Sequence, residues 1–307
     1  MAINDWLKST RRTYRDAVGF VVVRRLERRL SPSALYRLLW LFYTARATAN
    51  ELFRRPREYV GPPWLRFSNS LAARIRRRTQ RYLNLALQFL PDRLEERHWR
   101  ERCQVEGLEH LQAARAAGQP VVLAFFHFGV FYLVRDWLRG LGIPAAAFFG
   151  GRSTKRGKFT RLLDRLTPLP QVPLAFDPGQ LRAVSEFLAG GNILLMAVDS
   201  AAVKHVIVPI DVDWNYALAS GAARLAQRHQ AKLLLCSMRS EGCWRFRLKL
   251  SAPVPVEYLR TEADWLAANQ YLLAQIMPDL KLHPEELLFP ELILPRQGNP
   301  FNLGRSH

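Results

Sequence analysis

The stretch that most constrains the fold is Val121 to Leu133, which reads VVLAFFHFGVFYL. Six apolar residues run without interruption from Val121 to Phe126, and β-branched and aromatic side chains dominate the run. This pattern is typical of a short strand buried on both faces, as in a parallel sheet. Gly129 then allows a tight turn into a helix that we expect to begin near Val130.

His127 follows this run directly and is the first candidate for a catalytic group. It is expected just past the carboxyl end of the strand, and ligands bind at that end in open α/β sheets. An imidazole at this place can act as a general base. The alternative for a lone histidine is a core residue that bonds a nearby carbonyl group.

The rest of the chain predicts strands that alternate with helices of about ten residues. The expected strands are 143–149, 193–198, 205–214, 232–238 and 244–250, of which the last two form a hairpin. Helices are expected at 92–104, 105–118, 130–139, 158–166, 177–188, 220–229 and 265–277. The fold class is therefore α/β, with a mostly parallel central sheet flanked by helices. We assign residues 101–295 to this domain and 296–307 to a tail.

Residues 1–100 form a separate basic region. They hold 22 Lys and Arg against 8 Asp and Glu, in a chain whose net charge is +19. Helical spacing of apolar residues at 35–53 and 71–90 predicts amphipathic helices that lie on a membrane surface with anionic lipids. The alternative is helices packed on the domain with a solvated arginine face. Net charge alone suggests nucleic acid, but no nucleic-acid motif accompanies it, and we expect no such partner.

Several classes of protein are disfavoured by what the sequence contains. The three cysteines are odd in number and widely spaced, so neither a disulfide framework nor a metal site is expected. No signal peptide is expected at the first residues, and no apolar run reaches the roughly 18 residues of a spanning helix.

A glycine-led basic loop follows the strand at 143–149. It reads GGRSTKRGK from Gly150 to Lys158, and Arg152, Lys155 and Arg156 could hold a phosphate or an acidic carrier surface. A solvated basic turn is the alternative. Six aromatic residues near the strand ends could line an acyl chain tunnel or simply pack in the core: Phe125, Phe126, Phe128, Phe131, Phe148 and Phe149.

Four blocks of sequence, in order, resemble one enzyme family. They read RYLNLALQFLPDRLEERHWRE, VEGLEHLQAARAAGQPVVLAFFHFGVFYL, LAGGNILLMAVDS and HVIVPIDVDWNYALASGAARLAQRHQAKLLLC. Together these blocks resemble the bacterial lysophospholipid and lipid A biosynthesis acyltransferases over roughly residues 70–290. The resemblance implies a glycerol-3-phosphate acyltransferase-like fold at the cytoplasmic face of the bacterial inner membrane, bound peripherally or monotopically.

The resemblance also implies a reaction and a set of residues. Such enzymes move a fatty acyl chain from acyl carrier protein or coenzyme A to a hydroxyl on a lipid, with no further cofactor. Their dyad is a histidine followed after four residues by Asp or Glu. His127 matches the base, and Gly129 falls in the motif as a substrate-binding residue. Arg152, Lys155 and Arg156 would bind the phosphate of the acceptor or of the donor's pantetheine arm.

The dyad carboxylate does not match, because Tyr132 stands where the motif has its acid, with four residues between it and His127. A phenol is neutral at pH 7 and would not offset an imidazolium charge. Asp136 lies one helical turn further and is expected to pair with Arg135 or Arg139. Asp199, at the end of a neighbouring strand, could approach His127, or could cap a helix or bond a loop amide. If no carboxylate replaces the missing one, the chain would be an impaired family member that only binds lipid or acyl carrier.

Overall fold

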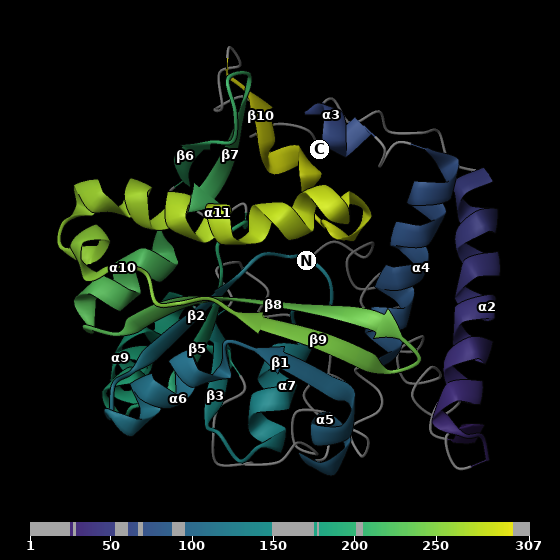
Figure 1. The fold of residues 1–307 in the computed structure, drawn as a ribbon, viewed down its shortest axis with the longest axis horizontal. Coiled ribbons are helices and arrows are strands. Elements are labelled where there is room, and N and C mark those ends of the chain that lie inside the picture. Colours follow the sequence, from purple (N-terminus) through teal and green to yellow (C-terminus); the bar gives the residue numbers. More distant parts are fainter. Residues whose placement is uncertain are drawn as a thin grey trace, which may run out of the picture.

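A seven-stranded sheet forms the centre of the computed structural model, which describes residues 25–26, 29–52, 61–66, 70–87, 96–148, 175–176, 178–200 and 205–296 (Figure 1). Its strand order is β1-β9-β8-β2-β5-β3-β4. All neighbouring strands run parallel except β8 and β9, which form the predicted hairpin. The strands are β1 Cys103–Glu106, β2 Val121–Phe125, β3 Ala145–Phe148, β4 Ala175–Phe176, β5 Ile193–Ala197, β8 Lys232–Gly242 and β9 Arg245–Leu250. The predicted fold class is confirmed.

Strand β2 lies between β5 and β8, and every one of its residues is buried. Alternate side chains enter two hydrophobic clusters, Val122 and Ala124 on one face and Val121 and Leu123 on the other. Helices cover both faces, as Figure 1 shows. The first cluster includes residues of α9 Leu181–Ala189, α10 Gly221–Arg228 and α11 Trp265–Leu282, and the second includes residues of α5 Glu96–Arg102, α6 Leu108–Ala116 and α7 Leu133–Gly140.

The prediction of one strand at 205–214 was wrong in its extent, because two strands occupy this region. The chain forms a hairpin there, β6 His205–Pro209 and β7 Trp214–Ala219, which joins β10 Ile293–Pro295 in a second, antiparallel sheet. The Asp211 carboxylate makes the turn, because it accepts hydrogen bonds from the backbone N–H groups of Asp213 and Trp214, both at 2.9 Å. Short aspartate side chains stabilise turns in this way.

The helix expected at 92–104 ends earlier than predicted. Helix α5 stops at Arg102, and the next four residues form β1, which pairs in parallel with β9. Gly107 then takes the left-handed conformation, with φ 75°, and α6 begins at Leu108. Parallel pairing with a distant strand supplies backbone hydrogen bonds that local sequence periodicity does not reveal.

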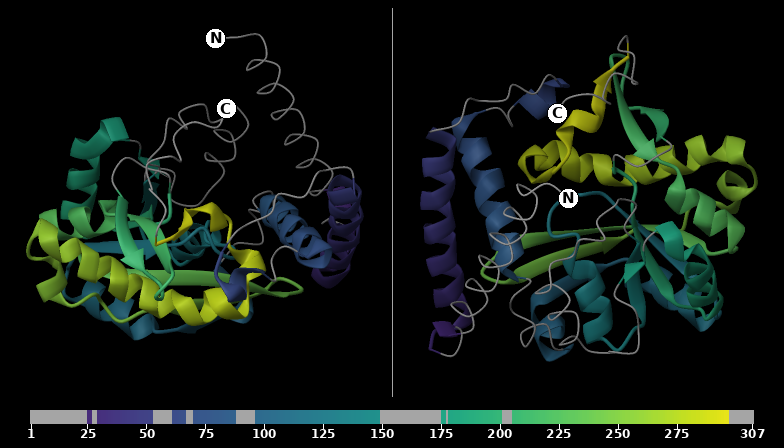
Figure 2. Two further views of the ribbon diagram at one scale, coloured as in Figure 1. Left: turned by 90° about the horizontal axis from the view of Figure 1, so that it is seen from above. Right: turned by 180° about the vertical axis from the view of Figure 1, so that it is seen from behind.

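Two helices, α2 Pro32–Leu52 and α4 Leu71–Leu87, lie side by side at one edge of the molecule (Figure 2). The short helix α3 Pro63–Arg66 lies between them in sequence. Glu51 of α2 is buried and accepts a hydrogen bond from Arg74 Nε at 3.0 Å, and it also pairs with Arg78. The ring of Tyr36 packs edge-on against Trp244 at the tip of the β8–β9 hairpin, with centroids 5.3 Å apart. The assignment of residues 1–100 to a separate region stays a prediction.

Helix α2 divides its apolar residues between the protein and its surface. Leu35 and Leu39 are buried against the domain, whereas an outward face exposes large apolar side chains. The exposed fractions of these side chains are 43% for Leu38, 44% for Trp40, 60% for Leu41, 58% for Phe42 and 66% for Leu52. Within the described residues, no helix combines the length and apolar character needed to cross a bilayer.

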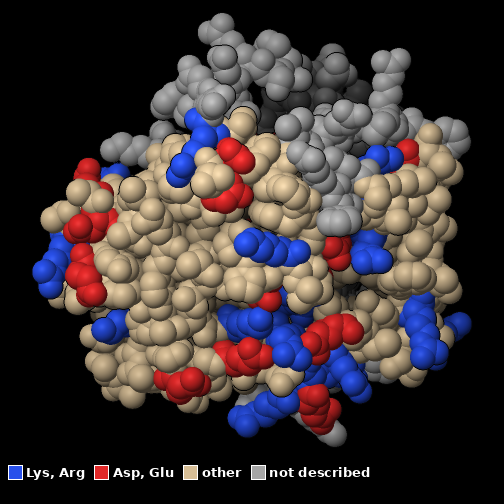
Figure 3. Space-filling view, turned by 45° about the horizontal axis from the view of Figure 1, so that its top comes forward, with Lys and Arg blue, Asp and Glu red and all other residues tan. Residues whose placement is uncertain are grey.

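Charge on the described surface is mixed rather than uniformly basic on the face drawn in Figure 3. Basic and acidic side chains gather together in the lower part of that face, while a broad area carries neither. Exposed ion pairs of the described residues include Arg247 with Glu106 and with Glu241, at 3.0 and 2.7 Å.

The contact of Glu51 with two arginines is expected to hold α2 on α4. Glu51→Ala would leave the two partly buried cations without their anion and lower the free energy of unfolding by about 2 kcal/mol. Glu186→Ala is the control, because it removes an exposed pair with Arg182 and should change stability by less than about 0.5 kcal/mol. Urea denaturation measures both, and equal losses in the two variants would contradict the prediction.

Candidate active site

His127 lies in a tight turn just beyond the carboxyl end of β2, as the sequence predicted. The N–H of Phe128 donates to the carbonyl of Phe126 at 2.6 Å, so the chain reverses around His127 as in a γ-turn. The N–H of His127 donates to both carboxylate oxygens of Asp199, at 2.9 and 2.8 Å, and its carbonyl accepts from Leu288 at 2.8 Å. Both peptide groups of the histidine are therefore held in place.

The imidazole of His127 contacts the same carboxylate. Its Nδ1 lies 2.8 Å from Oδ1 of Asp199, and the carboxylate can only accept there. The neutral ring that fits this contact carries its proton on Nδ1 and leaves a lone pair on Nε2. The side chain of His127 is 19% exposed whereas Asp199 is 0% exposed, so a buried acid orients a base that solvent can reach.

Strand register explains why these two residues meet. Strands β2 and β5 are parallel neighbours in which Phe125 pairs with Ala197. Each candidate residue lies two positions beyond its member of that pair, at the same edge of the sheet. The sequence analysis placed Asp199 where it could approach His127 or bond a loop amide, and the structure shows both contacts. Its catalytic role stays a prediction.

Burial raises the pKa of Asp199 above the usual carboxyl value, and the hydrogen bonds and charge of His127 oppose this rise. Removal from water disfavours the ionised acid, whereas a donor or a cation beside it favours the ionised acid. The donors that His127 supplies therefore favour the ionised carboxylate of Asp199 in a place where burial disfavours it.

Aromatic rings surround the imidazole. The centroids of Phe131 and Phe289 each lie 4.7 Å from that of His127, and Phe125 lies at 5.7 Å, all in edge-to-face geometry. These apolar walls leave the ring few orientations and place hydrocarbon beside the base. Four of the six aromatic residues that the sequence analysis named are buried in the two core clusters: Phe125, Phe126, Phe128 and Phe148. Their burial favours packing in the core over the lining of an acyl tunnel.

Gly129 closes the turn that carries His127. Its φ is 61°, and a Cβ at this position would lie 2.3 Å from the carbonyl oxygen of Met238. Only glycine fits such an approach without displacement of the neighbouring strand. Its predicted place in a tight turn is confirmed, whereas a substrate-binding role stays a prediction. Helix α7 then begins at Leu133 rather than near Val130.

A segment near the end of the chain braces this turn. Phe128 pairs with Leu287 in an antiparallel bridge, and the N–H of Gly129 donates to the carbonyl of Glu286 at 3.3 Å. The Glu286 carboxylate in turn accepts two hydrogen bonds from Arg239 of β8, at 3.1 and 3.0 Å. The sequence analysis missed this contribution, because backbone hydrogen bonds between distant segments leave no residue pattern.

Tyr132 does not replace the missing dyad carboxylate. Its hydroxyl is buried and hydrogen-bonds none of the described residues, His127 included. Burial, and next the charge of Asp136, raise the pKa of this phenol well above its usual value. Asp136 pairs with Arg135 at 3.0 Å, which is one of the two partners expected for it.

The remaining predicted binding residues cannot be placed. Arg152, Lys155, Arg156 and Phe149 lie outside the described residues. Among the residues that the structure does describe, no cluster of three or more His, Cys, Asp and Glu could hold a metal ion.

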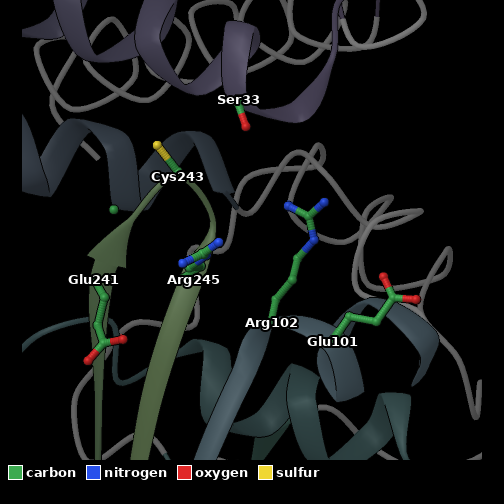
Figure 4. Close-up of a pocket in the computed structure, with 7 residues that line it drawn as sticks. Ser33, Glu101, Arg102, Glu241, Cys243 and Arg245 are labelled. Carbon is green, nitrogen blue, oxygen red and sulfur yellow. The ribbon is translucent and has the colours of Figure 1, made fainter.

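A cavity of about 550 Å³ lies away from His127, at the tip of the β8–β9 hairpin. Figure 4 shows Ser33 and Arg102 pointing into the space between α2 and the hairpin. Its lining is largely charged and includes neither His127 nor Asp199: Ser33, Glu101, Arg102, Glu241, Gly242, Cys243 and Arg245. This cavity therefore does not serve the imidazole.

Comparison with known proteins finds a matching family and several similar solved structures. The model of the family described as bacterial lipid A biosynthesis acyltransferase matches residues 85–289, more than half of the chain. The crystal structure of the 1-acyl-sn-glycerophosphate (LPA) acyltransferase PlsC from Thermotoga maritima is similar with a TM-score of 0.41 and 12% identity. That similarity covers 88% of this chain and 99% of the PlsC chain. No curated protein matches.

The raised pKa of Asp199 gives a test that needs no substrate. When the pKa of an acid is higher in the folded than in the unfolded state, the free energy of unfolding falls as the pH rises from the unfolded-state pKa to the folded-state pKa. Asp199→Asn removes the titration, so its free energy of unfolding relative to the wild type should rise from about pH 4 upward. Urea denaturation across this range measures the difference. A flat difference would contradict the raised pKa.

Proposed function

Because the chain belongs to the bacterial lipid A biosynthesis acyltransferase family, we propose that it moves a fatty acyl chain from a thioester to a hydroxyl of a lipid. The donor is acyl carrier protein or coenzyme A loaded with the acyl group. The acceptor is a lipid A precursor or another glycolipid. The observation that carries this proposal is the 2.8 Å contact between His127 Nδ1 and the buried Asp199 carboxylate.

The chemistry follows from the orientation of the ring. Nε2 of His127 accepts the proton of the acceptor hydroxyl while that oxygen attacks the thioester carbon. The carbon–sulfur bond then breaks, and the imidazolium returns its proton to the departing sulfur. The products are an ester and a free thiol. Asp199 holds the Nδ1–H tautomer and offsets the positive charge that forms on the ring.

The position of Asp199 also bears on the alternative that the chain is catalytically impaired. The impaired alternative was motivated by Tyr132 at the position where the family has Asp or Glu. In this chain the Asp199 carboxylate, two residues beyond the end of β5, contacts Nδ1 of His127. The geometry therefore favours an active transferase over a protein that only binds lipid or acyl carrier.

Loss of the base should abolish transfer. With purified protein, an acyl-carrier-protein thioester and a glycolipid acceptor, His127→Gln is expected to remove nearly all ester formation. Asp199→Asn should lower kcat by about 10²–10⁴-fold, because the ring loses its tautomer and its counter-charge. His229→Gln, which removes an imidazole that contacts Ser185 on the protein surface, is the control. Full activity in His127→Gln would overturn the mechanism.

We further propose that the protein works at the cytoplasmic face of the bacterial inner membrane, attached by α2. An outward apolar face with Leu38, Leu41 and Phe42 suits the boundary between headgroups and acyl chains. Exposed Arg37 and the strongly basic residues 1–100 suit anionic lipid. This placement would bring a lipid hydroxyl and the transferase to the same surface.

Vesicle flotation tests the attachment. The triple variant Leu38→Ser, Leu41→Ser, Phe42→Ser should bind vesicles containing anionic phospholipid about 100-fold more weakly, because three apolar side chains no longer leave water. The control is Leu266→Ser, Leu282→Ser, which removes exposed apolar side chains of α11. Equal binding by the two variants would contradict attachment through α2.

A further inference from the structure

A buried hydroxyl group in β7 has no partner that explains it. Tyr216 is 0% exposed, and among the described residues none is within hydrogen-bonding geometry of its hydroxyl. Buried polar groups are nearly always hydrogen-bonded, since an unmade bond leaves the cost of desolvation uncompensated. Phenylalanine would fill the same space without that cost. Packing of the core therefore does not explain why this position holds tyrosine instead of phenylalanine.

The surroundings of Tyr216 point to Asp199. Strand β7 ends beside that residue, because the N–H of Ala219 donates to the carbonyl of Val198 at 2.6 Å. The ring of Tyr216 packs against Phe126, next to His127, with centroids 5.7 Å apart. Burial raises the pKa of this phenol well above its usual value. The neighbouring charges of Asp199 and then of Glu291 add to the rise, and a weak side-chain hydrogen bond to Asp199 adds to it least.

Asp199 has capacity for one more donor. Its Oδ1 accepts from the N–H and from Nδ1 of His127 and its Oδ2 from the N–H of His127, and the backbone N–H of Asp199 itself also favours the ionised carboxylate. Each carboxylate oxygen can accept two hydrogen bonds. A fully buried carboxylate thus lies near a fully buried hydroxyl that makes no hydrogen bond of good geometry with the described residues.

We propose that Tyr216 is a positioning residue for the transferase, and that its hydroxyl donates a hydrogen bond to Asp199 when His127 takes up the acceptor proton. This inference rests on the proposed function. The donor favours the ionised carboxylate in a place where burial disfavours it, so Asp199 remains able to offset the imidazolium charge. The charged or titratable groups around the contact are His127 from the turn after β2 and Glu291 from the 3₁₀ turn Pro290–Leu292.

Tyr216→Phe separates this role from packing, because it removes only the oxygen. We expect kcat to fall about tenfold, as for a hydrogen bond to a charged group, with KM within about twofold of the wild type. The acidic limb of the pH profile of kcat/KM should move to higher pH, because without the donor the buried pair takes up its proton more readily. Tyr271→Phe, in a half-buried tyrosine of α11 that packs on the same cluster, should change neither.

A second readout keeps the inference independent of turnover. In protein labelled with ¹⁵N-histidine, the His127 signals, assigned with His127→Gln, report the pH at which the buried pair takes up a proton. That pH should be higher in Tyr216→Phe than in the wild type. If the shift occurs but the wild type transfers no acyl group, the proposed function fails and the contact stands. If transfer is normal and Tyr216→Phe changes neither kcat nor the His127 titration, the inference is overturned.

Discussion

One carboxylate fixes the geometry of the candidate active site. Asp199 accepts a hydrogen bond from the ring of His127 and two from its backbone N–H, so one group sets both the orientation of the imidazole and the shape of the turn that carries it. Full burial makes each of these contacts stronger and makes the ionised acid costly. Such a site is preorganised at the expense of stability, which is the usual relation between catalytic groups and their fold.

The route by which the acid reaches the base differs from the one that the family motif suggests. A carboxylate separated from the histidine by four residues would come from the same turn, whereas Asp199 lies just beyond the neighbouring parallel strand. Register between β2 and β5 then replaces local sequence spacing as the determinant of the distance. Any slip of that register would separate the pair, so the stability of the central sheet and the chemistry of the site depend on the same hydrogen bonds.

Sequence patterns predicted the parts of the structure that are encoded locally. The apolar run at 121–126, the turn at Gly129 and the hairpin of β8 and β9 all follow from residue type and spacing. Strand β1 escaped prediction because four residues carry too little periodicity, and the hairpin at Asp211 escaped because its turn depends on a side-chain contact. For Asp199 the sequence predicted a place at a strand end and left open whether it approaches His127, caps a helix or bonds a loop amide. For residues 286–289 it gave nothing, since their link to His127 consists of backbone hydrogen bonds and one ring contact.

The brace at residues 286–288 has a consequence for biosynthesis. The ribosome delivers β2 and His127 early, but the carbonyl of His127 finds its donor only when Leu288 has emerged. Until then the turn that carries His127 lacks its bridge to Leu287, and Arg239 lacks its ion pair with Glu286. The candidate active site of the nascent protein is therefore incomplete. A chain truncated before this point would keep most of its core yet lack the contacts that hold the imidazole in place, so the order of translation itself delays the competent state until residues 286–288 have been made.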